Sequence, residues 1–427
     1  MSVLIIEAGP AHTPQAGTHL RNTLPDDDFN RRAMKLLVPH AGSSDPIPGL
    51  PGTRGIHALG GMMIGWSHAV PRPQLPAEWD ETLPERELTR HLADAEALLW
   101  ASADLNGEGS RRQQWLESTI ESSLGLSPKR VPVAARRTAN GQLEYAGADA
   151  LLAGGPEDGE LTILTGYVAQ RIEHHGGRGV SVTARGSGGD EITASGATIV
   201  VGAGAVGTPQ LLFASGLRHP ALGRYMTDHL NLVSTVTLNK DLPEAIDGDA
   251  PVNLYLPVTE QRPFHTSIID LPSVAHTGMT FGDDSSRITN IGTFLGLEPA
   301  ESNGLRFSET ELDGFGLPAV TAHKELSQAD HERVAQALAD QYTLASTIGQ
   351  PWEGMASFLR PIGSALHLMG TNRIGLDENT SVASPEGLVR GTENIYVVGN
   401  GALGSRNSCN PTLTTVALAL HAAESIG

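Results

Sequence analysis

The chain has 427 residues, more than one hydrophobic core usually supports, so we expect two lobes that share an interface. Its net charge of −19 disfavours nucleic acid and anionic membrane surfaces as partners. A single cysteine, Cys409, excludes an intrachain disulfide, and no stretch approaches the roughly 20 apolar residues of a membrane-spanning helix, so we expect a soluble, cytoplasmic protein.

The first predicted element is a short buried strand over residues 2–6, because a continuous apolar run stops at Glu7 before a glycine and a proline. Residues 11–58 are rich in Asp, Pro, His and Gly and predict irregular structure. Residues 58–63 predict a turn of small residues at which the backbone can approach a ligand.

Two helices are expected next. Thr82 and Glu85 fit a capping box at the start of the first. The second is expected over 110–124 and is stopped by Gly125. The first helix should bury one face through regularly spaced apolar residues, namely Leu88, Leu92, Ala95 and Leu99.

Short β-rich runs separated by glycines cover residues 161–201 and predict a small meander that ends in a buried strand. A glycine-rich turn over 202–207 and an apolar helix follow. A strand, a glycine turn and a helix in succession are typical of nucleotide-binding folds.

Residues 231–320 contain further β-like segments and predict an antiparallel sheet. Ser327 is expected to cap a long helix that ends at Gly349.

The chain closes with a buried strand over 394–398 and an apolar helix over 411–426. Asn410 and Pro411 suit the N-cap and first position of that helix. The free N–H groups at such a helix start can also face an anionic part of a ligand.

Two single residues suggest chemistry. Glu7 follows the first strand, where a Rossmann fold carries the acidic residue that accepts hydrogen bonds from ribose hydroxyls. Taken alone, it fits a surface residue after a buried strand better than a ribose ligand. His367 lies between small residues before a glycine, and taken alone it fits a structural role better than a catalytic one.

Several blocks in the same order resemble the glucose-methanol-choline oxidoreductases, and the NPTLTT ending is most similar to pyranose oxidases and bacterial C-glycoside 3-oxidases. These blocks are IIEAGP at 5–10, GGMMIGWSHAVPRP at 60–73, ATIVVGAGAVGTPQLLFASGL at 197–217, LGRYMTDH at 222–229, DGFGLPAVT at 313–321, HLMGTNRIG at 367–375 and ENIYVVGNGALGSRNSCNPTLTTVALALHAAESI at 393–426.

The resemblance implies an α/β fold of the α+β kind, with a Rossmann-like lobe that binds FAD and a second, substrate-binding lobe that contains an antiparallel sheet. The FAD lobe would comprise 1–75, 150–230 and 360–427, with 76–149 as a helical connection and 231–359 as the substrate lobe. His265 and Gln261 are weaker polar candidates for contacting the substrate.

The resemblance also implies the site residues. His367 would be the catalytic base and Asn410 its partner. Glu7 would hold the ribose, Gly60, Gly61 and Met62 the diphosphate, and Val168 the adenine edge. The rest of the cofactor would be lined by Gly202, Ala203 and Asn400, with Pro411 and Thr412 beside the pyrimidine half of the flavin.

The sequence departs from the family pattern in two respects. Fungal pyranose oxidases attach FAD through a histidine before a tryptophan, but Gly65 precedes Trp66 here and His68 stands two positions later, so noncovalent FAD is expected. The usual opening strand, GxGxxG turn and helix are missing. We expect roughly 20–40 further residues upstream, since the lost loop is the main anion site for the diphosphate.

The implied reaction removes a hydride from a secondary hydroxyl carbon of a sugar or glycoside, with oxygen or a quinone-like acceptor completing the cycle. Loss of the hydride requires a base near the hydroxyl proton. A nonredox lyase on the same fold and an inactive relative that does not hold FAD remain as alternatives. No metal ion is expected, and the oligomeric state stays open.

Overall fold

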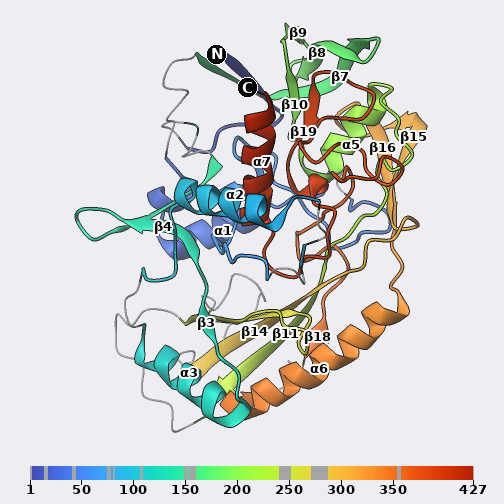
Figure 1. The fold of residues 1–427 in the computed structure, drawn as a ribbon. Helices are drawn as coiled ribbons and strands as arrows, with labels where there is room; N and C mark the ends of the chain where they lie inside the picture. The colour runs from blue at the N-terminus through green and yellow to red at the C-terminus, as the bar shows by residue number, and fades with distance from the viewer. Residues whose placement is uncertain are drawn as a thin grey trace.

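The computed structural model describes residues 2–13, 18–40, 45–74, 78–79, 82–105, 109–148, 152, 160–239, 252–270, 287–352 and 357–426. Figure 1 shows an upper lobe of short strands and helices above a lower lobe in which a sheet lies on a long helix. This mixed architecture confirms the expected fold class. Within the described ranges, no helix is long and apolar enough to cross a membrane.

The upper lobe contains two pairs of parallel strands. β1 (Val3–Glu7) pairs with β6 (Leu161–Thr165), and β10 (Ile199–Val201) pairs with β19 (Ile395–Val397). The sequence analysis placed β6 in a meander with its neighbours, but it pairs with the start of the chain instead. The described strands do not form one continuous sheet. Leu4 of β1 and Val200 of β10 are accordingly 43% and 49% exposed.

The meander itself is confirmed with three strands. β7 (Tyr167–His175), β8 (Arg178–Gly186) and β9 (Glu191–Ser195) are antiparallel, and β7 also contacts β1. After β10 the expected helix forms as α5 (Gly204–Ala214).

The lower lobe is an antiparallel sheet in the order β17-β11-β14-β13-β12-β3, with β18 also on β11. The strands are β3 (Lys129–Arg130), β11 (His229–Leu238), β12 (Asn253–Leu256), β13 (His265–Ile269), β14 (Ile288–Gly296), β17 (Gly349–Pro351) and β18 (Phe358–Leu359). This confirms the antiparallel sheet expected from the central segments. Its β3 comes from the segment expected to be a helical connection.

Two helices pack on this sheet (Figure 1). α6 (Gln328–Ile348) begins at Ser327, whose capping box with Asp330 confirms the predicted start. α3 (Arg111–Leu124) begins at the Ser110 cap and ends at Gly125 in the left-handed conformation, also as expected. Their apolar faces join the buried side chains of the strands in one core because both helices present i, i+4 spacing to the sheet.

Two features of the N-terminal third correct the sequence analysis. α1 (Asp26–Leu36), preceded by η1 (Leu20–Thr23), lies in the region expected to be irregular. Among the α1 side chains that the structure describes, Phe29 and Ala33 are the buried ones, so its apolar stripe is too short to stand out in the sequence. α2 (Glu85–Leu98) begins after Pro84 without a side-chain cap, so Thr82 does not form the predicted capping box.

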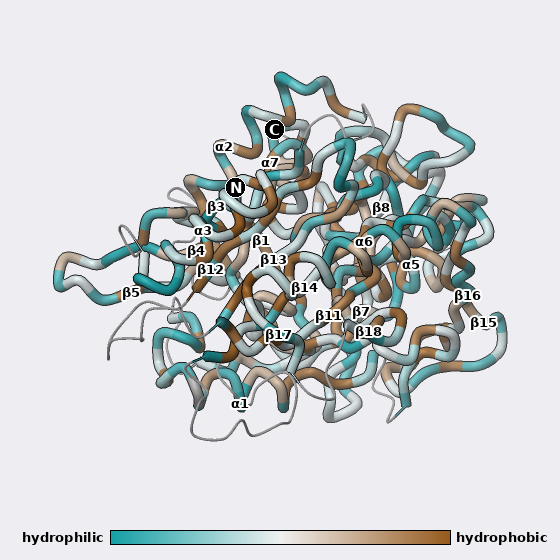
Figure 2. Tube along the Cα trace, turned by 90° about the horizontal axis from the view of Figure 1, so that it is seen from below, coloured by the Kyte–Doolittle hydropathy of each residue, from teal (hydrophilic) through white to brown (hydrophobic). Residues whose placement is uncertain are grey.

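The remaining elements lie outside the lower sheet. They are η2 (Gly61–Ile64), β2 (Ala101–Ser102), β4 (Val133–Arg137), β5 (Leu143–Tyr145), β15 (Gly304–Leu312), β16 (Pro318–His323), η5 (Asn400–Ala402) and α7 (Thr412–Ile426). β15 and β16 contact α5, and α7 packs against α2 and η5. The two ends of the chain lie close together in both Figure 1 and Figure 2.

Candidate active site

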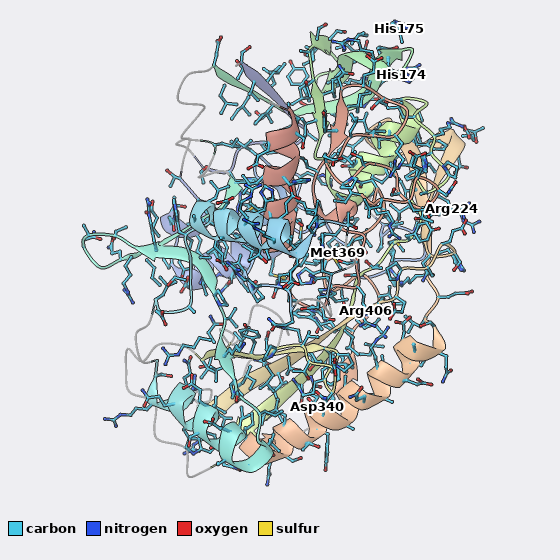
Figure 3. The ribbon with its side chains drawn as sticks, in the orientation of Figure 1. His174, His175, Arg224, Asp340, Met369 and Arg406 are labelled. Atoms are coloured by element: carbon cyan, nitrogen blue, oxygen red, sulfur yellow. The ribbon has the colours of Figure 1, made fainter. Side chains whose placement is uncertain are left out.

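The structure brings the two expected catalytic side chains together across 43 residues of sequence. Nδ2 of Asn410 lies 3.5 Å from Nε2 of His367, and both side chains are part-buried. The ring of Phe294 on β14 meets the His367 ring edge-on at a centroid distance of 5.2 Å. Figure 3 shows Met369, two residues after His367, in the band between the upper lobe and the lower sheet. The candidate site therefore lies where the lobes meet.

Backbone contacts fix the segment that carries His367. Met369 and Thr227 exchange both backbone hydrogen bonds, at 2.9 and 3.0 Å. Leu366 has a φ of 62°, which is uncommon for a residue with a side chain and turns the chain sharply before His367. Oδ1 of the buried Asp228 accepts hydrogen bonds from the backbone N–H of His367 at 3.2 Å and of His229 at 2.7 Å. One carboxylate thus orders two adjacent histidines.

The ring of His229, the first residue of β11, contacts the ring of His367. Their Nδ1 atoms lie 2.9 Å apart, so one must donate and the other accept. Because the amide of Asn410 can only donate to Nε2 of His367, the consistent assignment puts the His367 proton on Nδ1, where it is donated to His229. This tautomer leaves the lone pair of His367 Nε2 on the side of Asn410.

Burial sets the protonation states in this cluster. It lowers the pKa of His367 to about 4, so the imidazole is neutral at pH 7 and able to accept a proton. Burial, together with His367, also lowers the pKa of His229 well below its usual value. Burial raises the pKa of Asp228 to about 7, because the carboxylate loses hydration that its hydrogen bonds replace only in part.

A second buried carboxylate orders the segment before Asn410. Oε1 of Glu78 accepts hydrogen bonds from the backbone N–H groups of Ser408 at 2.6 Å and Cys409 at 3.0 Å, and Oε2 accepts from Gln74 at 2.7 Å. Burial raises the pKa of Glu78, and its hydrogen bonds oppose that rise. Glu78 therefore acts on the position of Asn410 through the backbone.

Asn410 does not occupy the helix position that the sequence indicated. α7 begins at Thr412, and the carbonyl of Pro411 accepts the first intrahelical hydrogen bond, from Thr415 at 2.9 Å. Pro411 is thus the N-cap, and Asn410 lies one residue outside the helix. Its amide is free of capping and faces His367 instead.

The residues expected around the adenosine half gather at the end of β1. Oε1 of Glu7 accepts a hydrogen bond from Gly9 at 2.7 Å, and burial raises the pKa of this carboxyl. A side chain at Gly9 would overlap the backbone of residues 57–58, so the turn after β1 packs directly on the segment that leads to Gly60. Val168 stands on β7, the strand that contacts β1.

Gly60 and Gly61 both have positive φ, at 99° and 56°, at the start of η2. A Cβ built on Gly61 meets nothing within 4 Å, and Met62 beside it is 37% exposed. The backbone here is therefore open to a ligand, as the close approach of a diphosphate requires.

The residues expected around the rest of the cofactor gather at the carboxyl ends of β10 and β19. Gly202 and Ala203 are exposed between β10 and α5. Asn400 follows β19, and its Oδ1 accepts a hydrogen bond from Thr415 of α7 at 2.5 Å. α7 thereby brings Pro411 and Thr412 into the same region. Side chains built on two nearby glycines, Gly204 and Gly399, also meet open space. This edge of the lobe fits a nucleotide cofactor.

The two weaker candidates differ in their surroundings. The His265 ring stacks on Tyr255 at 5.0 Å, and its Nε2 lies 3.1 Å from Oγ of Ser267. Burial, followed by His367, lowers its pKa to about 3, which places it in the same buried histidine cluster. Gln261 is exposed, and its carbonyl accepts a hydrogen bond from Gln336 of α6, so it lies away from this cluster.

Sequence reasoning missed Asp228, His229 and Glu78. The first two stand in the LGRYMTDH block, so a signal was present, but nothing in it showed that they face His367. Glu78 lies in a proline-rich stretch with no motif, and only its burial and contacts reveal its role.

Comparison with known proteins identifies the family. Residues 141–231 and 299–419 match the N-terminal and C-terminal family models described as GMC oxidoreductase. The chain is 30% identical to a C-glycoside 3-oxidase of Microbacterium trichothecenolyticum over 100% of its own length and 91% of that protein. It is 27% identical to a pyranose 2-oxidase of Tricholoma matsutake, with 92% of this chain and 76% of that protein covered.

A solved structure of a formate oxidase variant of Aspergillus oryzae RIB40 shares the fold, with a TM-score of 0.75 at 13% identity over 100% of this chain and 93% of that one. The chain therefore belongs to the GMC oxidoreductases, a family of flavin-dependent enzymes that act on CH–OH groups.

Proposed function

We propose that this protein oxidises a secondary hydroxyl of a sugar or glycoside, with noncovalent FAD as cofactor and His367 as base. The observation that carries the proposal is the contact between His367 Nε2 and the Asn410 amide, backed by His229 on the other ring nitrogen. The relatives that act on pyranoses and C-glycosides, as their names state, supply the substrate class.

His367 accepts the hydroxyl proton at Nε2, which burial keeps deprotonated at neutral pH. Asn410 donates a hydrogen bond and cannot titrate near pH 7, so it orients the same hydroxyl. His229 accepts the Nδ1 proton of His367 and fixes the tautomer. Phe294 and His265 on the lower sheet support a substrate wall formed by that lobe, which also limits the access of water.

FAD, when bound, supplies the hydride acceptor at its N5 atom, and oxygen or a quinone-like compound would regenerate it. The residues that would hold it are Glu7 at the ribose, Gly60, Gly61 and Met62 at the diphosphate, Val168 at the adenine, Gly202, Ala203 and Asn400 along its length, and Pro411 and Thr412 near the flavin. The open glycine backbones at both ends of this set support that assignment.

Two observations support noncovalent binding. A side chain at Gly65, the position of the linking histidine in fungal relatives, would approach Cδ1 of Ile56 to 2.8 Å, so the local packing suits glycine. His68 is buried, with Nε2 2.9 Å from His19 and Nδ1 3.2 Å from Arg21, and burial lowers its pKa well below the usual value. Acid precipitation should release the flavin to the supernatant. Colour retained in the pellet would refute noncovalent binding.

The function is tested by anaerobic mixing of the FAD-loaded protein with a C-glycoside, an O-glycoside and a free pyranose. Loss of the oxidised flavin absorbance with one of these classes, and its return on admission of oxygen or a quinone, is the expected result. A protein that consumes a hydroxynitrile without any change in flavin absorbance would be a nonredox lyase and would overturn the proposal. The single buried cysteine also suits a cytoplasmic enzyme.

A further inference from the structure

A cluster of ligating side chains lies between α2 and α7, on the helix that follows Asn410. Glu87 and His91 are four residues apart on α2 and therefore share one face. His421 stands on the facing side of α7. Its Nδ1 lies 3.3 Å from Oε1 of Glu87 and 3.2 Å from Nε2 of His91. The ligand atoms of all three residues lie within 4.8 Å of one another.

The two separations from His421, 3.2 and 3.3 Å, are close to those of a zinc-type site. Ligand atoms at about 2.0–2.2 Å from a tetrahedral ion are about 3.3–3.6 Å apart. The donor set, two imidazoles and one carboxylate, is one that divalent zinc-type ions accept with an open fourth position. The cluster reaches solvent, because 37% of the Glu87 side chain is exposed.

The burial of the rings also favours metal binding. His91 is fully buried and His421 is 7% exposed, so both rings are held in place by the helix packing. Oε2 of Glu424 lies 3.8 Å from His91 Nε2 and adds a second carboxylate at the edge of the cluster.

We propose that Glu87, His91 and His421 bind one divalent ion of the zinc type and thereby tie α7 to α2. No local motif marks this site, because His421 lies 330 residues from His91 in the chain. The site is separate from the catalytic cluster. One of its ligands lies on α7, the helix that begins just after Asn410. A bound ion would therefore stabilise the fold without contacting the substrate.

Arg90 determines how the site can fill. Its guanidinium lies 2.9 Å from His91 Nε2 and is held by both oxygens of Glu424, at 2.7 and 2.8 Å. Half of the Arg90 side chain is exposed, so it can turn into water when an ion arrives. Arg90 thus competes with the metal. If the cluster is a metal site, removal of Arg90 should strengthen metal binding. If the cluster is only a hydrogen-bond network, removal of Arg90 should weaken that network.

The test is equilibrium dialysis of the purified full-length protein against Zn²⁺ after treatment with EDTA. One ion per chain should bind with micromolar or lower Kd. His421→Gln and Glu87→Gln should each raise that Kd at least about tenfold, as loss of a ligand does, and Arg90→Gln should lower it several-fold. Arg86→Gln, on the same helix, and His331→Gln, an exposed histidine on α6, are the matched controls and should leave the Kd unchanged.

Thermal unfolding gives a readout that does not depend on activity. Saturating Zn²⁺ should raise the Tm of the parent protein by roughly 2–6 °C and that of Glu87→Gln by clearly less. Glu87→Gln keeps the size of a partly exposed side chain, so it is informative even where His421→Gln does not fold. Binding that is substoichiometric at tens of micromolar Zn²⁺, equal in the parent and Glu87→Gln, or weakened by Arg90→Gln would overturn the proposal.

Discussion

Nδ1 of His229 lies 2.9 Å from Nδ1 of His367, and this contact joins the first residue of β11 in the lower sheet to the loop that carries the candidate base. The contact leaves the other nitrogen of His367 for the substrate. A lobe boundary that shifts by even 1 Å would break it, so the packing of the two lobes and the tautomer of the base are linked.

The first prediction concerns His229 as a positioning residue. His229→Phe removes the acceptor for the Nδ1 proton of His367, so kcat should fall about 10- to 100-fold while KM changes little, because the lost contact orients the base rather than the substrate. His229→Gln retains an acceptor oxygen and should recover part of the loss. Steady-state kinetics of both variants at matched FAD content measure this. Equal kcat values for His229→Phe and His229→Gln would indicate that His229 contributes only by packing and not as a hydrogen-bond acceptor.

His367 itself is tested by substitution and by pH. His367→Ala should slow flavin reduction by about 10²–10⁴, the usual cost of a lost general base, with FAD content unchanged. In the parent protein the base must be neutral. With a pKa of about 4, kcat/KM should be flat above about pH 5 and fall roughly tenfold per unit below pH 4. An acid limb that survives in His367→Ala would assign the pKa to another group.

Asn410 gives a sharper electrostatic test. Asn410→Asp places a carboxylate beside Nε2 of His367, 3.5 Å away in the parent, and a negative neighbour raises the pKa of an imidazole. The acid limb of kcat/KM should therefore move to higher pH in Asn410→Asp but not in Asn410→Ala. Because Asn410 lies outside the cap of α7, neither variant should lose helix stability, and circular dichroism melts should superimpose. If the acid limb of kcat/KM is unshifted in both variants, Asn410 does not lie beside the base.

Glu78 is expected to act through the backbone before Asn410. Glu78→Ala leaves the buried N–H groups of Ser408 and Cys409 without their acceptor, which costs about 1–3 kcal/mol per group and should lower both the stability and kcat. Glu78→Gln keeps one acceptor oxygen and should restore most of kcat. Urea unfolding and turnover rates of the pair check this. If Glu78→Gln loses as much kcat and stability as Glu78→Ala, the negative charge of Glu78 is required, and an acceptor oxygen alone is not enough.

Asp228 makes stability depend on pH. Its folded-state pKa, about 7, is raised above its unfolded value, so the protonated form stabilises the fold and this contribution is lost as pH rises from about 4 to 7. Asp228→Asn cannot ionise. The free energy of unfolding of the variant relative to the parent should therefore increase over that range by an amount on the order of a few kcal/mol and be flat above it. Urea titrations of Asp228→Asn and the parent at several pH values measure the slope.

The sequence by itself determined many of the local elements, and its motif blocks carried the two residues proposed for the centre of the candidate site. The periodicity of 328–348 and the capping box at Ser327 specified α6, and the apolar run that stops at Glu7 specified β1, because both signals arise from neighbours within a few residues. The motif blocks also carried His367 and Asn410, which the structure brings to 3.5 Å.

Only the tertiary structure decided which distant segments meet. The pairing of β6 with β1, the approach of His229 to His367 and the contact of Glu78 with the backbone at residues 408–409 join residues far apart in the chain. The same holds for Glu87, His91 and His421 between α2 and α7. No local pattern encodes these contacts, because they depend on how whole faces of strands and helices pack, and that packing is settled by the summed burial of many side chains.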